Sequence, residues 1–254
     1  MMNVSYGPPP YKEPIQQPMD QEPFCAIGRM RMSDGTHWYA GTGSLITKRY
    51  IITAAHVLAN KTGGMISFGF ELGDNGNGAR TVNIARAAIP AAYPAAPGSD
   101  IGVAQLAGDY NGTFGFLFNL DGQGNDRKGA LTSVTQKGSI TIAGYPAAGP
   151  VSPDMHPDVV LDHQYAKTGP VADYHLGNHS VSYQFDTRGG ESGSPLFAMP
   201  SGRCQLIGVH TGWDVKNDRQ VGEGTLLTDE KLRWVKQAIH QLETAHGGPF
   251  VLTV

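Results

Sequence analysis

Three short segments carry residue types that together could activate a serine hydroxyl. They are Thr-Ala-Ala-His-Val (53–57) with His56, Ser-Asp-Ile-Gly (99–102) with Asp100, and Gly-Gly-Glu-Ser-Gly-Ser-Pro (189–195) with Ser192. A serine hydroxyl is a weak nucleophile until a neighbouring imidazole accepts its proton. A carboxylate can hold that imidazole in one tautomer and stabilise its charge. We therefore expect Ser192 to be a nucleophile, His56 its base and Asp100 the group that orients the histidine.

The order of these residues along the chain narrows the class of hydrolase. Histidine comes first, aspartate second and serine last, whereas α/β-hydrolases have serine first and subtilisins have aspartate first. The serine segment also departs from the Gly-x-Ser-x-Gly elbow of α/β-hydrolases, because Ser194 occupies the last glycine position. Both observations favour the histidine-first class.

The same segments resemble those of the chymotrypsin-like serine proteases. TAAHV resembles their histidine motif, GTGSLI (41–46) the strand before it, and GESGSP their serine motif in the form found in bacterial glutamyl endopeptidases. The wider string from Tyr183 to Pro195 is similar to that branch as well. The resemblance implies an oxyanion hole formed by the backbone N–H groups of Gly190 and Ser192, and it places Thr211 beside Asp100.

The resemblance leaves two substrate preferences open. It places Thr187, His210 and Trp213 around the pocket for the residue before the scissile bond, where imidazolium and hydroxyl donors would suit an acidic side chain. Asp186, six positions before the nucleophile, would instead suit lysine or arginine, as in trypsin-type enzymes. We favour Glu or Asp because His210 has no role in a trypsin-type pocket, although it could be an ordinary core histidine.

Two further classes of function remain as alternatives. An inactive protease fold could serve as a binding module, and the His156–His179 region could hold a metal for a metal-dependent hydrolase. The chain has no H-E-x-x-H motif, and the spacing His175-x-x-x-His179 falls on a Gly-Asn pair typical of a loop. We therefore expect no metal and no cofactor.

Composition bounds the partners. The resemblance implies protein or peptide substrates. The 254 residues are 40% hydrophobic and 16% charged with a net charge of −3 and have no long apolar run, so we expect no nucleic acid and no membrane as partners. The first residues lack the apolar core of a secretory signal, which favours an unsecreted protein unless a signal was removed. Cys25 and Cys204 are far apart in sequence, and we interpret them as buried free thiols.

The elements that must position these residues are short strands. Apolar stretches recur between turns in two series separated by the polar segment LDGQGNDRKG, which suggests two barrels or one large sandwich. The resemblance favours an all-β fold of two packed six-stranded antiparallel barrels with a C-terminal α-helix. We expect an extended or disordered arm at 1–21, an N-terminal barrel at 22–120, a linker at 121–132, a C-terminal barrel at 133–228 and a helix at 229–245.

The last segment has the spacing of an amphipathic helix. Leu232, Val235, Ile239 and Leu242 recur on one face, with Thr228 or Asp229 available as the N-cap. We expect this helix to pack against the C-terminal barrel.

Overall fold

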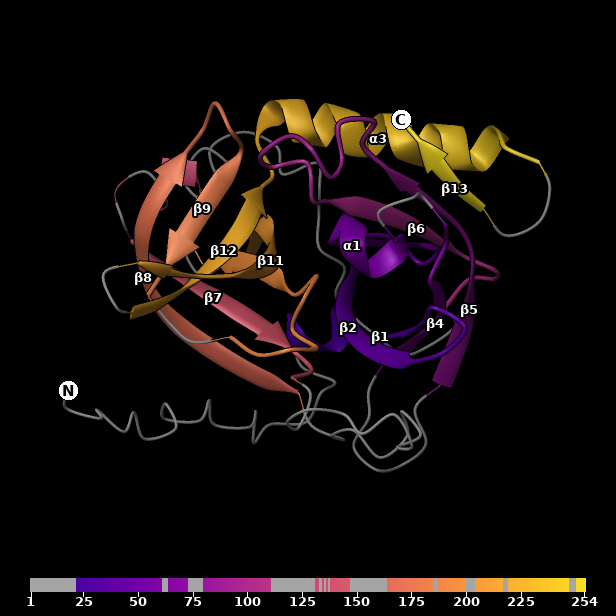
Figure 1. Ribbon diagram of the computed structural model, residues 1–254, viewed down its shortest axis with the longest axis horizontal. Coiled ribbons are helices and arrows are strands. Elements are labelled where there is room, and N and C mark those ends of the chain that lie inside the picture. Colours follow the sequence, from indigo (N-terminus) through magenta and orange to yellow (C-terminus); the bar gives the residue numbers. More distant parts are fainter. Residues whose placement is uncertain are drawn as a thin grey trace.

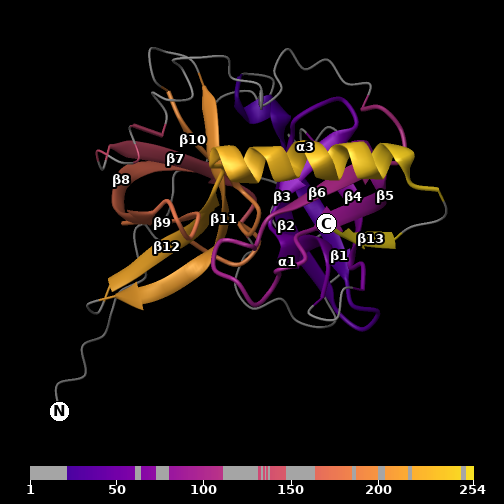
Figure 2. The same cartoon turned by 90° about the horizontal axis from the view of Figure 1, so that it is seen from above.

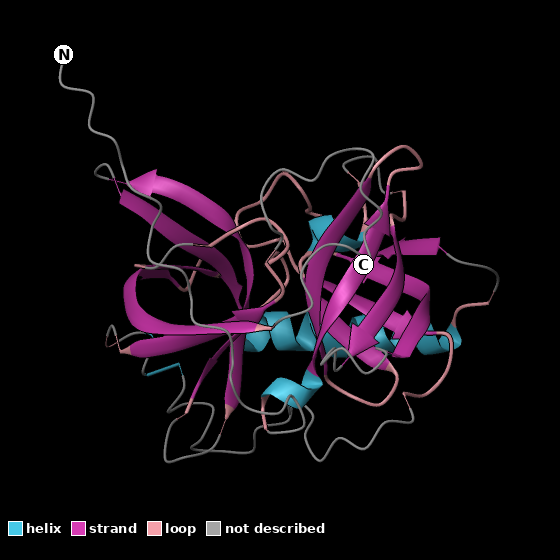
Figure 3. Cartoon of the chain, turned by 90° about the horizontal axis from the view of Figure 1, so that it is seen from below, coloured by secondary structure: helices cyan, strands magenta, loops and turns pink. Residues whose placement is uncertain are grey.

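Two β-barrels lie side by side in the structure, a computed structural model (Figure 1). The residues that it describes are 22–60, 64–72, 80–110, 131–132, 134, 136, 138–146, 164–184, 187–199, 204–216, 219–246 and 250–254. Figure 3 shows that strands make up both lobes, which face each other across the middle of the molecule. The predicted arm at 1–21 and nearly all of the predicted linker lie outside the described residues.

The first barrel follows a short 3₁₀ turn, η1 (Phe24–Ala26). Its strands are β1 (Ile27–Ser33), β2 (Trp38–Leu45), β3 (Tyr50–Thr53), β4 (Ser67–Leu72), β5 (Arg80–Ile89) and β6 (Gly102–Leu106). They pair in the order β5-β4-β1-β2-β3-β6, and β6 pairs again with β5 to close the barrel. The four residues of β3 and the five of β6 are all buried, because these strands lie between the barrel interior and the material packed outside it.

The second barrel is closed by six strands in the order β10-β11-β12-β9-β8-β7. They are β7 (Ser139–Gly144), β8 (Tyr165–His175), β9 (Ser180–Tyr183), β10 (Pro195–Ala198), β11 (Gln205–Lys216) and β12 (Arg219–Leu226). Its core gathers apolar side chains from every strand, including Ile140, Val181, Leu196 and Ile207. Two six-stranded antiparallel barrels confirm the fold class expected from the sequence.

The C-terminal helix corrects one expectation. The helix α3 (Asp229–Thr244) begins at the N-cap Thr228, as the sequence predicts, but it packs mainly on β5 and β6 of the first barrel. Its first turn contacts the second barrel, where Glu230 lies 3.5 Å from His179. Leu232, Val235 and Leu242 join the first core. Figure 2 shows α3 running across the strands of the first barrel. Amphipathic spacing shows that one face must be buried and does not say against which surface.

The chain then returns to the first barrel in a strand that the sequence analysis did not assign. The strand β13 (Phe250–Thr253) runs parallel to β5 at the edge of the sheet. Its neighbour Val254 accepts a hydrogen bond from the Trp234 indole at 3.1 Å, which ties the strand to α3. Both α3 and β13 therefore pack on the first barrel.

Two smaller expectations can also be compared with the structure. Both cysteines are free thiols; Cys25 is buried and Cys204 is partly buried. Burial raises the pKa of the Cys204 thiol to about 12, so this thiol is protonated at neutral pH. No helix within the described segments is long and apolar enough to cross a membrane.

Candidate active site

Antiparallel pairing of β3 with β6 brings His56 and Asp100 together. Thr53 at the end of β3 is opposite Gly102 at the start of β6. The chain turns into the one-turn helix α1 (Ala55–Leu58) directly after β3, while Asp100 lies just before β6. Residues that leave paired antiparallel strands at the same end must be neighbours. The pairing of β3 with β6 thus brings together two side chains that are 44 positions apart in the sequence.

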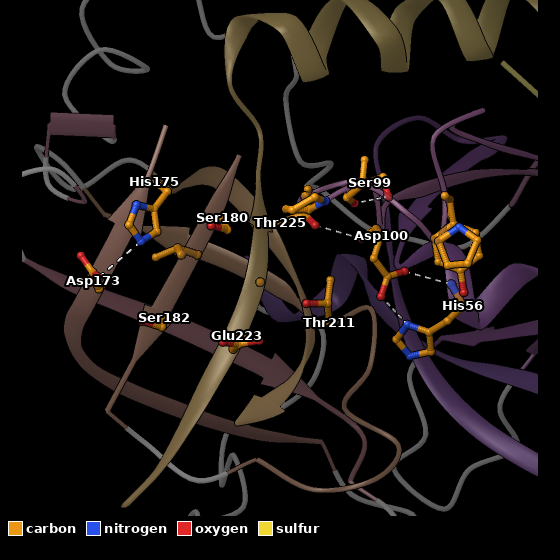
Figure 4. Close-up of a pocket in the computed structure, with 17 residues that line it drawn as sticks. His56, Ser99, Asp100, Asp173, His175, Ser180, Ser182, Thr211, Glu223 and Thr225 are labelled. Carbon is orange, nitrogen blue, oxygen red and sulfur yellow. Dashed lines mark hydrogen bonds and ion pairs between the residues drawn. The ribbon is translucent and has the colours of Figure 1, made fainter. Parts of the chain in front are cut away.

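The carboxylate of Asp100 holds His56 through both oxygens. The His56 backbone N–H donates to Oδ1 at 3.0 Å, and the ring Nδ1 donates to Oδ2 at 2.7 Å (Figure 4). A protonated Nδ1 leaves Nε2 as the acceptor, which is the tautomer that a general base requires. The two side chains remain 33% and 26% exposed, so the pair borders solvent.

The Ser192 loop is fastened to the first barrel by Thr42 of β2. The Thr42 N–H donates to the Ser192 carbonyl oxygen at 2.8 Å, and its hydroxyl donates to the Gly190 carbonyl oxygen at 2.9 Å. Gly193 follows at φ 85°, its Cα against Thr53 and Ala54, the residues that lead into the His56 helix. These contacts place Ser192 beside the segment that carries His56.

The turn around Ser192 presents two backbone donors. Gly190 has φ 88°, a left-handed conformation that glycine adopts without strain. Glu191 is fully buried, and its carboxylate accepts a hydrogen bond from the Arg188 N–H at 2.6 Å. This hydrogen bond helps to fix the conformation of the loop. Within the described part of the chain, the N–H groups of Gly190 and Ser192 make no hydrogen bond. Two such donors fit the stabilisation of a developing oxyanion.

The third contact of the expected triad, between Ser192 and His56, is not made in the structure. Ser192 is partly buried, and its hydroxyl makes no hydrogen bond to His56 in the described structure. Such contacts are often long in the absence of substrate.

His210 is buried in the second barrel and held by Tyr183. Its Nδ1 lies 3.0 Å from the Glu223 carbonyl oxygen and 2.5 Å from the Tyr183 hydroxyl, which itself donates to the same carbonyl at 3.1 Å. A carbonyl oxygen only accepts, so Nδ1 carries a proton and Nε2 is the nitrogen that can address a ligand. Burial raises the pKa of Tyr183 well above its usual value, which keeps this hydroxyl a donor.

The other predicted pocket residues differ in their positions. Thr187 is buried before the serine loop, and Asp186 lies outside the described residues. Thr211 lines the same cleft as His56 and Asp100. In the described structure it does not hydrogen-bond the Asp100 carboxylate, whose two oxygens are both engaged by His56. Trp213 is 58% exposed at the surface of β11.

Two residues with a role at the site, Thr42 and Tyr183, were not predicted from the sequence. Thr42 lies inside the GTGSLI motif and Tyr183 begins the string that ends at Pro195, but neither motif indicates what these side chains contact. Their roles depend on contacts between distant strands, which residue types alone do not specify.

The described residues hold no group of three or more His, Cys, Asp or Glu side chains arranged to bind a metal ion. His175 ends β8 and His179 lies in the turn before β9, as the loop interpretation predicts. His156 and the rest of the segment before residue 164 lie outside the described residues.

Two antiparallel barrels, a hydrogen-bonded His–Asp pair and a glycine-flanked serine between them define a chymotrypsin-like serine protease fold. The model of the trypsin-like peptidase domain matches residues 41–209, and the chain belongs to this family. Its sequence is also similar to a glutamyl endopeptidase of Bacillus licheniformis, at 26% identity over 221 residues. That alignment covers 82% of this chain and 61% of the relative, so the chain spans less than two thirds of that protein.

Solved structures show the same fold. A Glu endopeptidase in complex with MPD matches with a TM-score of 0.65 at 21% identity, over 91% of this chain and 97% of that one. The protease Anisep from Arthrobacter nicotinovorans matches with a TM-score of 0.61 at 17% identity, over 85% of this chain and 96% of that one. The thermostable serine protease AL20 from an extremophilic microorganism matches with a TM-score of 0.58 at 17% identity, over 87% and 98%.

Proposed function

We propose that this trypsin-like peptidase is a serine endopeptidase that works through Ser192, His56 and Asp100. The observation that carries the proposal is the His56–Asp100 pair, with both carboxylate oxygens on the histidine. Next to it is a serine loop with two N–H groups that no described residue pairs. These parts match what acyl transfer needs, namely a base with a fixed tautomer, a nucleophile and an oxyanion site.

Peptide hydrolysis proceeds in two steps, acylation of Ser192 and hydrolysis of the acyl-enzyme. His56 Nε2 takes the Ser192 proton as Oγ attacks the scissile carbonyl, and the Gly190 and Ser192 N–H groups stabilise the oxyanion. The protonated histidine then gives its proton to the leaving amine, and the C–N bond breaks to leave an acyl-enzyme. Water attacks the ester with His56 again as base, and Ser192 recovers its proton when the acid product leaves.

A matched pair of serine variants tests this proposal. Ser192→Ala should abolish hydrolysis of casein and of peptides while the thermal unfolding temperature stays within a few degrees. Ser194→Ala is the control, because the Ser194 hydroxyl is fully buried without a hydrogen-bond partner among the described residues and its loss should be tolerated. Hydrolysis that persists in Ser192→Ala would refute the proposal, and a wild type that never hydrolyses peptides would favour the binding-module alternative.

For specificity we propose a preference for Glu or Asp before the scissile bond. His210 and Thr187 lie on the two segments that wall this pocket in the family that the chain resembles, and the relative from Bacillus licheniformis is named a glutamyl endopeptidase. Since Nδ1 of His210 is already protonated, an acidic side chain would bind Nε2 as a second N–H donor of an imidazolium.

A proteome-derived peptide library gives the test. The wild type should cut after Glu or Asp, and His210→Ala should lose this preference by at least about tenfold, while the exposed His240→Ala on α3 should keep it. Cuts after Lys or Arg in the wild type would show that the trypsin-type alternative through Asp186 is right.

A further inference from the structure

A cleft of about 660 Å³ opens beside His56 and Asp100 (Figure 4). One wall is the 93–100 segment of the first barrel, and the floor is the sheet of β8, β9 and β12 in the second. Its lining residues are His56, Tyr93, Pro94, Ala96–Asp100, Asp173, His175, Ser180–Ser182, Thr211 and Glu223–Thr225. Two separate barrels thus build a cavity that is continuous with the candidate catalytic pair.

The strand register sets the chemistry of the floor. Ser182 on β9 is directly opposite Asp173 on β8 and Glu223 on β12. Residues opposite each other in a sheet project to the same face. Neighbouring strands are about 4.8 Å apart, so the two carboxylate-bearing residues are roughly 10 Å apart with a serine between them. A second row, two residues along, consists of His175, Ser180 and Thr225 on the same three strands.

The serine at the centre of the first row points to a ligand. Ser182 is only 6% exposed and lines the cleft, yet its hydroxyl makes no hydrogen bond within the described structure. This hydroxyl faces the cleft without a protein partner among the described residues, so it is free to accept a hydrogen bond from a ligand donor. Beyond Glu223 the row reaches Gly212 of β11, where an added Cβ would meet nothing within 4 Å, so this end of the row stays open.

The charges that face the cleft are predominantly negative. Asp173 and Glu223 contribute two carboxylates and Asp100 a third, which His56 engages. Among the lining residues that the structure describes there is no lysine or arginine, and the only cationic candidate besides His56 is His175, 3.5 Å from Asp173 and 63% exposed.

We propose that this cleft is a second specificity site, which takes an arginine or lysine side chain located two to four residues before the scissile bond. The proposal rests on the proposed endopeptidase function. The upstream side follows from Thr211, which lines the cleft and lies on β11, the strand expected to wall the pocket for the residue before the scissile bond. An arginine has five N–H donors on a planar fork and can reach the Asp173 and Glu223 carboxylates with the Ser182 hydroxyl between them.

Paired peptides test the charge directly. Each peptide has the same glutamate before the scissile bond and arginine or its neutral isostere citrulline at one of the three preceding positions. At one of these positions the wild type should hydrolyse the arginine peptide with a kcat/KM at least about fivefold higher. Raising the salt concentration should reduce this ratio because both carboxylates border solvent.

Variants of the two carboxylates test whether the floor of the cleft causes the preference for arginine over citrulline. Asp173→Asn and Glu223→Gln should each reduce the arginine-to-citrulline ratio about two- to fivefold, since one partly exposed ion pair contributes on this scale. Glu243→Gln, which removes an exposed carboxylate on α3 away from the cleft, should leave the ratio unchanged.

The outcomes separate the two proposals. Equal hydrolysis of arginine and citrulline peptides at all three positions would overturn the second site and leave the endopeptidase function standing. An arginine preference that survives both Asp173→Asn and Glu223→Gln would also overturn it. If the wild type hydrolysed no peptide at all, the proposed function and the second site would fail together.

Discussion

Replacing Gly193 with alanine perturbs the contact that sets the Ser192 loop against the first barrel. Gly193 has φ 85°, and a Cβ built on it would lie 2.0 Å from the Thr53 hydroxyl oxygen and 2.2 Å from the Thr42 carbonyl oxygen. The carbonyl belongs to β2, which is paired on both edges with β1 and β3. The strand cannot move away easily, so the loop must shift instead.

The size of the effect follows from these distances. Ordinary contacts of a Cβ begin at about 3.4 Å, which means that the loop has to move by more than about 1 Å. A displacement of about 1 Å at a reacting group can cost about 100-fold in rate. Left-handed strain of about 1–2 kcal/mol and overpacking of about 1–3 kcal/mol add up to a destabilisation of about 2–5 kcal/mol. For a chain of this size that corresponds to a fall in Tm of about 5–15 °C.

The assay compares two alanine variants in the same loop. Gly193→Ala should lower kcat/KM for peptide hydrolysis at least about 100-fold and lower the Tm, both measured below the unfolding transition. Gly189→Ala is the matched control, since its Cβ would meet nothing within 4 Å and its φ is not in the left-handed region. A Gly193→Ala enzyme with wild-type activity and Tm would refute the reasoning that this contact positions Ser192.

Three further outcomes follow from other contacts. Asp100→Asn should lower kcat about ten-thousandfold with little change in fold, because an amide cannot hold His56 in the tautomer of a base. Glu71→Ala should cost about 3–5 kcal/mol of stability, because it removes the buried carboxylate bonded to Arg29 at 2.6 Å and 2.9 Å. The free energy of unfolding should fall as the pH drops below about 6.5, since burial first, and a nearby lysine second, lower the pKa of His179 in the folded state.

Each of these outcomes has its own check. Steady-state kinetics with circular dichroism separates lost chemistry from lost fold in Asp100→Asn, and a loss below tenfold would contradict the assigned tautomer. The free energy of unfolding in urea is compared for Glu71→Ala and Glu243→Ala. The Glu243 side chain on α3 is exposed, so its replacement should cost less than about 0.5 kcal/mol of stability. For His179, urea unfolding at pH 5 and pH 8 should show a smaller pH difference in His179→Gln than in the wild type, and an unchanged difference would exclude this group as a source.

Candidate catalytic residues can be proposed from the sequence because their chemistry depends on residue type and local turns. His56, Asp100 and Ser192 each lie in a short motif with its own glycine or strand signal, and their order along the chain selects the hydrolase class. What motifs do not give is the support behind them. Thr42 holds two carbonyl groups of the serine loop from another barrel, a contact between residues 148 positions apart.

Contacts between distant segments also explain why the packing surface of α3 was predicted wrongly and why β13 was not predicted. The spacing of Leu232, Val235 and Leu242 gives the buried face of α3, but the partner surface depends on how the two barrels sit together. The strand β13 has four residues and pairs in parallel with β5, far away in the sequence, so no local pattern marks it.

The residues of the proposed second specificity site could not be grouped from the sequence. Asp173, Ser182 and Glu223 become neighbours only through strand register, and a bulge between Val171 and Asp173 sets that register on β8. A shift of one residue would turn all the β8 side chains to the other face.

The most direct test of the central claim is to find which residue becomes covalently modified. The wild type is treated with a fluorophosphonate, digested and mapped by tandem mass spectrometry, with His56→Ala treated in parallel. The proposed mechanism predicts one adduct on Ser192 in the wild type and little or none in His56→Ala, because the hydroxyl is then without its base. An adduct on another serine, or no adduct on the folded wild type, would contradict the claim that Ser192 is an activated nucleophile.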